Sequence, residues 1–254
     1  MSFDTCEKLV KAGDHDRWLS ARSAPPEGRR ALMAIYATNL MIARAPWASP
    51  EPLVAQIRLQ WWADEIDKIY KGEVVTSHEI LPALREVIFD HNLPVGLFQS
   101  MIEARHFDIG AAPHIGRAEF DTYIHSTAGA TMALAARALG AQDAHLQIVR
   151  QFAYGAGVAS LLRAVQELEA RGRVPLPQNR SEIVVDAQKS IAAAKARRHG
   201  LPAALTPALL AGWRAYSTLA YARKSPDMIS AGALEESPFR KRTSLLWRQL
   251  SGRW

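Results

Sequence analysis

The chain has little cysteine and no long apolar run. Its one cysteine, Cys6, excludes a disulfide within the chain, and nothing else indicates an oxidising compartment. The longest stretch of apolar, Gly and Thr residues, 128–136, is far shorter than the ~20 residues of a membrane-spanning helix. Residues 1–16 are charged throughout and lack the apolar core of a secretory signal. We therefore expect a cytoplasmic protein or one attached peripherally to a membrane.

Two segments lack acidic residues altogether. Charged residues make up 22% of the chain, yet 28–50 and 144–166 contain no Asp or Glu. Divalent cations need carboxylate oxygens, so these segments offer no Mg²⁺ site. None of the eight histidines belongs to a zinc motif, and no Gly-rich phosphate loop is present. We expect no metal and no cofactor.

Apolar residues recur at helical spacing, and no sustained alternating stretch is present, which predicts an all-α protein. Proline and glycine mark the helix ends. The expected helices cover 3–12, 26–45, 52–71, 79–90, 95–109, 118–139, 143–170, 181–199, 207–223 and part of the tail. Gly155 and Gly157 indicate close contacts between helices. Short connections and the absence of a flexible linker predict a single domain over residues 1–254.

The net charge of +6 is concentrated at the C-terminal end. Residues 240–254 include five basic residues and no acidic one, which points to an anionic partner or surface. Leu246, Leu250 and Trp254 follow one another at intervals of four in the basic, Trp-containing segment 237–254. This pattern fits a docking or membrane-surface helix, and equally a helix whose leucines pack onto the domain. No nucleic-acid motif is present, so we expect no nucleic-acid partner.

Four stretches together resemble the phytoene/squalene synthase family. They are DRWLSARSAPPEGRRALMAIYATN (16–39), IRLQWWADEIDKIYKG (57–72), YIHSTAGATMALAARALG (123–140) and YGAGVASLLRAVQELEARGRVPLP (154–177). The resemblance implies an all-α isoprenoid (prenyl) synthase fold, a helical bundle around a central cavity. It also implies Mg²⁺ and the head-to-head joining of two prenyl diphosphates, for which the family uses two acidic pairs.

This chain departs from the family at those acidic pairs. Carried over from the motifs, the acidic positions are Ala43, Trp47, Ala164 and Leu168. Pro46 also disrupts the first helix where its second carboxylate would project. The nearest surviving acid, Glu167, is one residue from Leu168 and therefore about 100° around the helix. We therefore expect no catalytic residues, and a pseudoenzyme.

Other polar and aromatic positions in these motifs are candidate binding residues. Five residues match polar positions of the family and are candidates to line the cavity and hold an anion: Arg22, Tyr36, Arg58, Gln60 and Arg163. The alternative is that the arginines among them pair with carboxylates of neighbouring helices for structural reasons. Candidates for docking to a partner or membrane are Trp62, Arg240, Lys241, Arg242, Trp247, Arg248 and Trp254. For Trp62 the alternative is core packing, and for the acidic cluster 64–67 we expect a solvated helix face.

The runs YATN…IRLQWW and LLRA…ARGRVPLP resemble one branch of the family in particular. That branch lacks the acidic pairs and contains the mitochondrial assembly factor for respiratory complex I. The resemblance implies a non-catalytic protein that binds or helps assemble NADH:ubiquinone oxidoreductase, through its subunits or assembly intermediates. Its expected place is the cytoplasmic side, peripheral to a bacterial inner membrane, or a mitochondrial matrix. The alternatives are a head-to-head prenyltransferase and a protein that binds a lipid or prenyl chain in its cavity.

Overall fold

The computed structural model describes residues 2–110 and 116–254, and these residues form helices and connecting segments without a β-strand. The α-helices are α1 (Ser2–Gly13), α2 (His15–Ala21), α3 (Pro26–Arg44), α4 (Pro52–Tyr70), α5 (Leu81–Asp90), α6 (Val95–Ala104), α7 (Arg117–Ile124), α8 (Ala130–Ala138), α9 (Asp143–Ala170), α10 (Arg180–Ala196), α11 (Thr206–Leu209), α12 (Ala215–Lys224), α13 (Asp227–Ser230) and α14 (Pro238–Ser251). The all-α prediction is confirmed.

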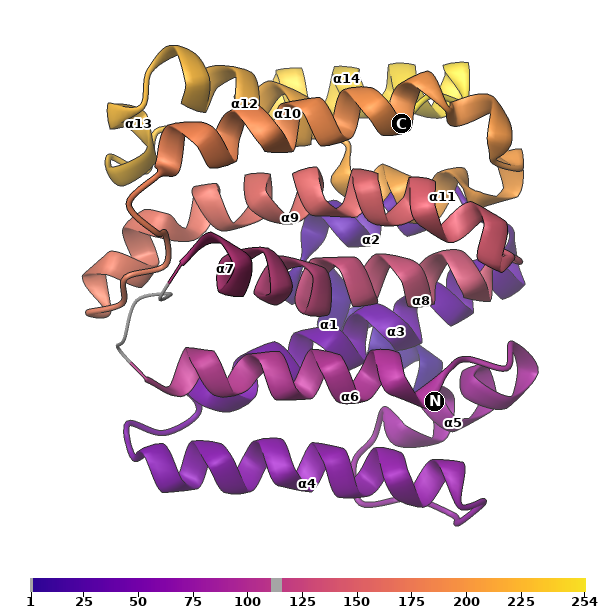
Figure 1. Ribbon diagram of the computed structural model, residues 1–254. Coiled ribbons are helices and arrows are strands. Elements are labelled where there is room, and N and C mark those ends of the chain that lie inside the picture. The colour runs from indigo at the N-terminus through magenta and orange to yellow at the C-terminus, as the bar shows by residue number, and fades with distance from the viewer. Residues whose placement is uncertain (1, 111–115) are drawn as a thin grey trace.

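The helices are stacked around α9. Figure 1 shows α4 at one end of the molecule, α10, α12 and α14 at the other, and α9 running between them. Buried side chains of α9, such as Phe152 and Leu162, share one core cluster with Tyr36 of α3 and Ile191 of α10. No helix in the described ranges is long and apolar enough to cross a membrane.

Local signals set several helix ends. Asp14 caps α2 by accepting a hydrogen bond from the Arg17 amide at 3.0 Å. Pro26 stands in the first turn of α3, and the 3₁₀ helix η1 (Ala45–Trp47) takes over where Pro46 prevents α3 from continuing. Gly72 ends α4 with a φ of +83°, a conformation that favours glycine.

Two expected helices are broken in the structure. The 118–139 helix contains a π-helical turn, η3 (His125–Gly129), between α7 and α8. The 207–223 helix is interrupted by the 3₁₀ turn η6 (Leu210–Gly212), where the chain passes close to α9. A Cβ on Gly212 would lie 2.7 Å from the Cβ of Ala156, so the break follows from a tertiary contact.

The apolar pattern of α4 predicts that its buried face includes Leu53, Ile57, Trp61, Ile66 and Ile69. This prediction is right for Ile66 and Ile69 and wrong for Leu53 and Ile57. Leu53 and Ile57, placed on that face, are 66% and 60% exposed. The buried face carries Ala55, Leu59, Trp62, Ile66 and Ile69. The expected solvated acidic face is also only partly right, because Glu65 is buried and accepts hydrogen bonds from Lys68 at 2.7 Å and Ser77 at 2.5 Å.

Candidate functional site

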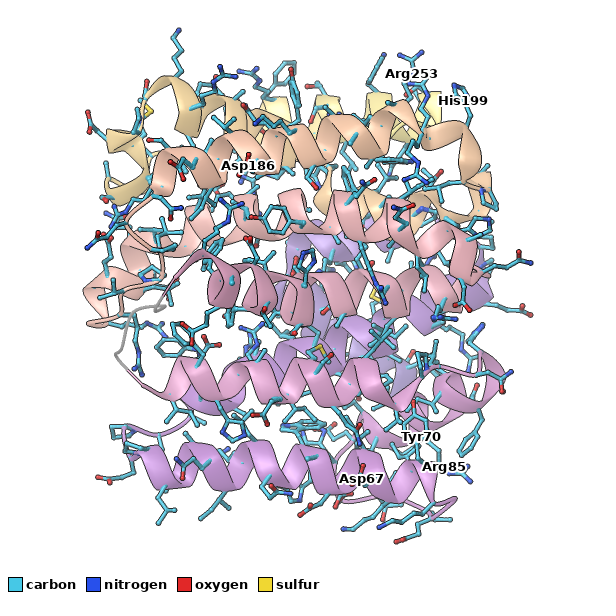
Figure 2. All side chains as sticks on the ribbon, in the orientation of Figure 1. Asp67, Tyr70, Arg85, Asp186, His199 and Arg253 are labelled. Carbon is cyan, nitrogen blue, oxygen red and sulfur yellow. The ribbon has the colours of Figure 1, made fainter. Side chains whose placement is uncertain are left out.

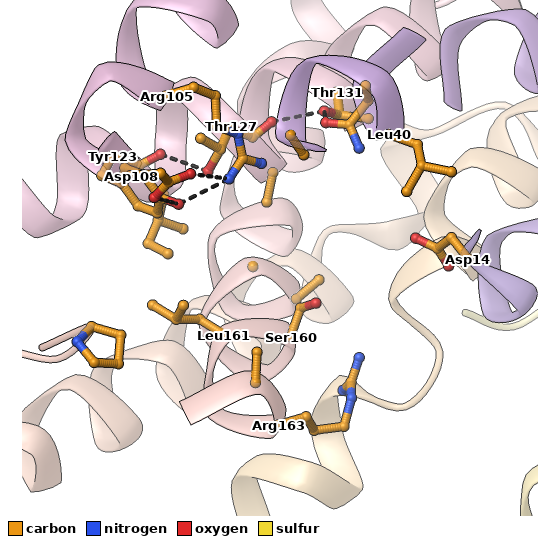
Figure 3. Close-up of a pocket in the computed structure, with 18 of the residues that line it drawn as sticks. Asp14, Leu40, Arg105, Asp108, Tyr123, Thr127, Thr131, Ser160, Leu161 and Arg163 are labelled. Atoms are coloured by element: carbon orange, nitrogen blue, oxygen red, sulfur yellow. Dashed lines mark hydrogen bonds and ion pairs between the residues drawn. The ribbon is translucent and has the colours of Figure 1, made fainter. Parts of the chain in front are cut away.

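A cavity of about 380 Å³ lies inside the bundle. Its wall includes residues of α3, α9 and the continuous segment formed by α7, η3 and α8. The 3₁₀ helices η1, η2 (Arg105–Ile109) and η6 also contribute to it. Figure 3 shows side chains from these segments facing one another across this space. Most small-molecule sites are concave, largely apolar and preformed, so this cavity is the candidate site.

The four degenerate acidic positions all line this cavity. Ala43 on α3 and Trp47 on η1 belong to one wall, and Ala164 and Leu168 on α9 belong to the facing one. These walls therefore present methyl groups, an isobutyl group and an indole where the family pattern calls for carboxylates.

Trp47 is held by two arginines from the segment that follows α9. The guanidinium carbons of Arg171 and Arg173 lie 5.1 and 5.0 Å from its ring centroid. Arg173 also donates a hydrogen bond to the Ile109 carbonyl at 3.0 Å. The indole and the Arg173 guanidinium group thus line the same part of the cavity, with Arg171 beside them.

A partly buried polar cluster also lines the cavity. Arg105 donates to Asp108 at 2.8 Å and to the Tyr123 hydroxyl at 2.9 Å, and Tyr123 donates to Asp108 at 2.9 Å (Figure 3). Burial opposes the charge of Arg105, but Tyr123 and Asp108 outweigh it, so its pKa is raised. For Tyr123, burial raises the pKa of the hydroxyl. The Arg105 guanidinium and the Tyr123 hydroxyl therefore both keep their protons at neutral pH.

Arg163 presents a less compensated charge to the cavity. Figure 3 shows its guanidinium pointing into the space from α9. Its contacts are long: 3.3 Å to the Thr218 hydroxyl and 3.9 Å to Glu235. Burial, followed by the nearby charge of Arg214, lowers its pKa.

Tyr36 adds a further polar atom to this wall. Its ring is 2% exposed and its hydroxyl, among the described atoms, has no hydrogen-bond partner. Burial raises its pKa. Tyr36 and Arg163, both predicted to line the cavity, do so.

The other three predicted cavity residues lie outside its lining, and that prediction is wrong. Arg22 lies over the Trp18 ring at 4.9 Å. Arg58 is exposed on α4, and Gln60 donates to Asp64 at 2.8 Å along the same helix. No residue of α4 lines the cavity, so neither side chain contributes to its wall.

Conversely, sequence reasoning missed Arg105, Arg173 and Arg214 as lining residues. Arg105 follows a helix end, and its partner Tyr123 is distant in sequence, so no spacing pattern could have paired them. Arg173 stood within a quoted motif, RGRVPLP, but only the fold brings it to Trp47.

Two of the predicted docking aromatics are buried, and for Trp62 this is the core packing given above as the alternative. Trp62 is 4% exposed and packs edge-on against the half-buried Trp61 at 4.9 Å. Trp254 is 7% exposed and packs against Phe152 at 4.6 Å, because the chain turns inward after α14. The remaining docking candidates lie on α14, where Trp247 is 56% exposed. They are Arg240, Lys241, Arg242, Trp247 and Arg248.

Residues 10–228 match the Squalene/phytoene synthase family. The chain belongs to this family. Curated relatives include "NADH dehydrogenase (ubiquinone) complex I, assembly factor 6" of Bos taurus, which is 24% identical over 176 residues, covering 68% of this chain and 52% of the relative. The Drosophila melanogaster homolog of that factor is 28% identical over 176 residues, 67% of this chain and 52% of the relative. The chain thus spans about half the length of these relatives.

Solved structures of squalene/phytoene synthase-type enzymes share this fold. A dehydrosqualene synthase in complex with ligand has a TM-score of 0.69 at 16% identity, covering 98% of this chain and 96% of that one. Squalene synthase HpnC from Alicyclobacillus acidocaldarius has a TM-score of 0.74 at 17% identity, covering 88% and 94%. At these identities the likeness shows the fold alone.

The Mg²⁺ implied by the squalene/phytoene synthase family does not fit the residues of this cavity. Its carboxylates are already paired with guanidinium groups: Asp14 with Arg17 at 3.2 Å, Asp16 with Arg214 at 2.7 Å and Asp108 with Arg105 at 2.8 Å. Across 2–110 and 116–254, no three His, Cys, Asp or Glu residues are grouped to hold an ion. We therefore derive no step through a metal.

Proposed function

We propose that this protein is a non-catalytic member of the squalene/phytoene synthase family that binds or helps assemble respiratory complex I. The observation that carries the proposal is the cavity wall of Ala43, Trp47, Ala164 and Leu168. Ionising an allylic diphosphate concentrates negative charge on the leaving group, and metal ions must neutralise it. Neutral side chains at all four positions cannot hold those ions.

The relatives support the choice of partner. The curated mammalian and insect proteins that match 67–68% of this chain carry complex I assembly factor 6 in their names. On this basis we place the protein peripheral to the membrane that houses complex I, on the cytoplasmic side of a bacterial inner membrane or in a mitochondrial matrix.

Affinity purification at native expression levels tests this function. We expect complex I subunits or assembly intermediates to co-purify with the tagged chain, compared with an untagged strain. Deleting the gene should lower NADH:ubiquinone oxidoreductase activity, and re-expression should restore it. An eluate without these subunits, together with normal oxidoreductase activity after deletion, would contradict the proposal.

A second candidate function is supported by the retained cavity, which could hold a lipid or prenyl chain. Its wall is largely apolar on α3 and α9, and Arg163 supplies a charge for an anionic head group. Native mass spectrometry of the purified protein tests this idea. A co-purified lipid that is lost on Leu161→Trp, which fills the cavity, would support it, whereas a protein that never carries lipid would exclude it.

The enzymatic alternative gives a separate prediction. Incubation with farnesyl diphosphate and Mg²⁺ should release no diphosphate above the rate seen without protein, because no carboxylate pair holds the metal. Isothermal titration should show the same diphosphate binding with Mg²⁺ as with EDTA. A coupling product that requires Mg²⁺ would overturn the non-catalytic assignment.

A further inference from the structure

Helix α14 carries a stripe of large apolar side chains in contact with solvent. Phe239, Leu246, Trp247 and Leu250 are 77%, 57%, 56% and 81% exposed. Their spacing of seven, one and three residues puts them within one face of the helix. We call these four residues the outer stripe. The helix lies outside residues 10–228, the part that matches the family.

The outer stripe is not the face that attaches α14 to the rest of the protein. Attachment comes through Leu245, which is 5% exposed, and through Trp254 against Phe152 of α9. Arg240 also donates to the Tyr221 hydroxyl of α12 at 2.7 Å, and Lys241 pairs with Glu235. The helix is therefore held in place while the outer stripe stays uncovered.

Positive charge flanks the outer stripe. At 100° per residue, Arg242 lies on one side of it and Arg240 on the other. Arg253 lies over the Trp247 ring at 5.7 Å. In the ranges that the structure describes, Arg242, Arg248 and Arg253 form no ion pair, and residues 240–254 contain no acid.

The unneutralised charge extends to α10. Lys195 lies over the Tyr216 ring, and burial together with Arg248 lowers its pKa to about 8. Arg240 and Lys241 pair with Glu236 and Glu235, but Arg242, Arg248 and Arg253 form no ion pair in the described ranges. These three cations make the surface complementary to an anionic one.

We propose that the outer stripe inserts shallowly into the surface of an anionic lipid bilayer, with the flanking arginines at the lipid phosphates. A short amphipathic helix with large apolar and aromatic residues on one face and basic residues beside them has this affinity. Tryptophan prefers the interfacial zone, and arginine stems reach past the apolar face to the head groups. This inference deepens the peripheral location proposed above and rests on that part of the proposed function.

The orientation of the protein follows from the same helix. Figure 1 shows α14 and α4 at opposite ends of the molecule, and Figure 2 shows Arg253 at the end away from Asp67 of α4. Binding through α14 would therefore leave α4, with its own exposed Leu53 and Ile57, directed away from the lipid. Those two residues make α4 a matched control.

Vesicle flotation of the purified full chain tests the inference. We expect binding to vesicles of equimolar phosphatidylcholine and phosphatidylglycerol, little binding to phosphatidylcholine alone, and weakening by salt. Leu246→Ser with Leu250→Ser should weaken binding by more than about tenfold, since two leucine side chains would no longer insert into the lipid. Arg242→Gln should weaken it by about fivefold, the effect of one basic residue near an anionic surface.

The control is Leu53→Ser with Ile57→Ser on α4, which should bind as the unaltered chain does. All these side chains are exposed, so the melting temperature of each variant should be unchanged. Equal binding to neutral vesicles, full binding by the α14 variant, or equal loss by the α4 variant would overturn the inference.

The two proposals fail separately. A chain that binds no vesicles but still purifies with complex I subunits would overturn the lipid surface and leave the proposed function intact. A chain that binds anionic vesicles through α14 but does not purify with complex I subunits would support the lipid surface and contradict the proposed role in complex I assembly.

Discussion

Replacing Arg214 with methionine is expected to lower the free energy of unfolding by about 3 kcal/mol, because it removes the cation from a buried ionic cluster. The Arg214 side chain is 5% exposed. It pairs with Asp16 of α2 at 2.7 Å, with Glu235 at 2.9 Å and with the buried Glu236 at 3.8 Å. Methionine keeps the packing but removes the cation that joins these carboxylates, leaving Asp16 unpaired and Glu235 and Glu236 with only their outer partners Lys241 and Arg240.

The effect should depend on pH in a defined direction. Burial raises the pKa of Glu235, but hydrogen bonds from Lys241 and Arg214 outweigh it, so the pKa in the folded protein lies below its usual value. A depressed folded pKa contributes stability above the unfolded value of about 4.3 and loses it as the pH falls further. The gap between the unaltered protein and Arg214→Met should therefore narrow below about pH 4.3.

Chemical denaturation of both proteins across this pH range measures the effect. Arg223→Met is the control, since Arg223 is exposed on α12, the helix that begins directly after Arg214, and donates to the Gln188 amide oxygen. Its effect should stay within about 0.5 kcal/mol. Equal stability of Arg214→Met and the unaltered chain at neutral pH would refute this account of the cluster.

Gly155→Val is expected to cost about 3 kcal/mol, since α9 and α10 meet at this residue with no room for a side chain. A Cβ there would lie 2.4 Å from Cγ1 of Ile191 and 2.7 Å from the Ala187 carbonyl oxygen. The first neighbour can change rotamer, but the second belongs to the backbone of α10. The helix itself would have to move away.

Two further variants sharpen this test. Ile191→Ala combined with Gly155→Val should recover only part of the loss seen in thermal unfolding, because the carbonyl contact remains. Gly96→Ala on α6 meets nothing within 4 Å, so it should be neutral or stabilising by up to about 1 kcal/mol. A harmless Gly155→Val would contradict the account of a contact at this site that leaves no room for a side chain.

Much of the fold could be predicted because its signals are local. Pro26 and Gly72 mark helix ends through their own backbone chemistry, and the structure confirms them. The close contacts predicted at Gly155 and Gly157 are also confirmed.

The failures share a different cause. Helix α4 has apolar residues on two faces, and periodicity cannot say which one meets the core, so Leu53 and Ile57 were placed on the wrong side. The break between α11 and α12 depends on α9 passing beside Gly212. The arginines of the cavity came together from distant segments for the same reason, so only tertiary structure could reveal them.

The 3₁₀ turn at residues 45–47 limits what a single substitution could do for metal binding. An aspartate placed at position 47 would sit on η1, not on a continuation of α3, and would face the guanidinium groups of Arg171 and Arg173. The aspartate would form ion pairs with those guanidinium groups and would not be free to bind Mg²⁺. We therefore expect Trp47→Asp alone to give the cavity no measurable affinity for Mg²⁺, because the new carboxylate would pair with these arginines.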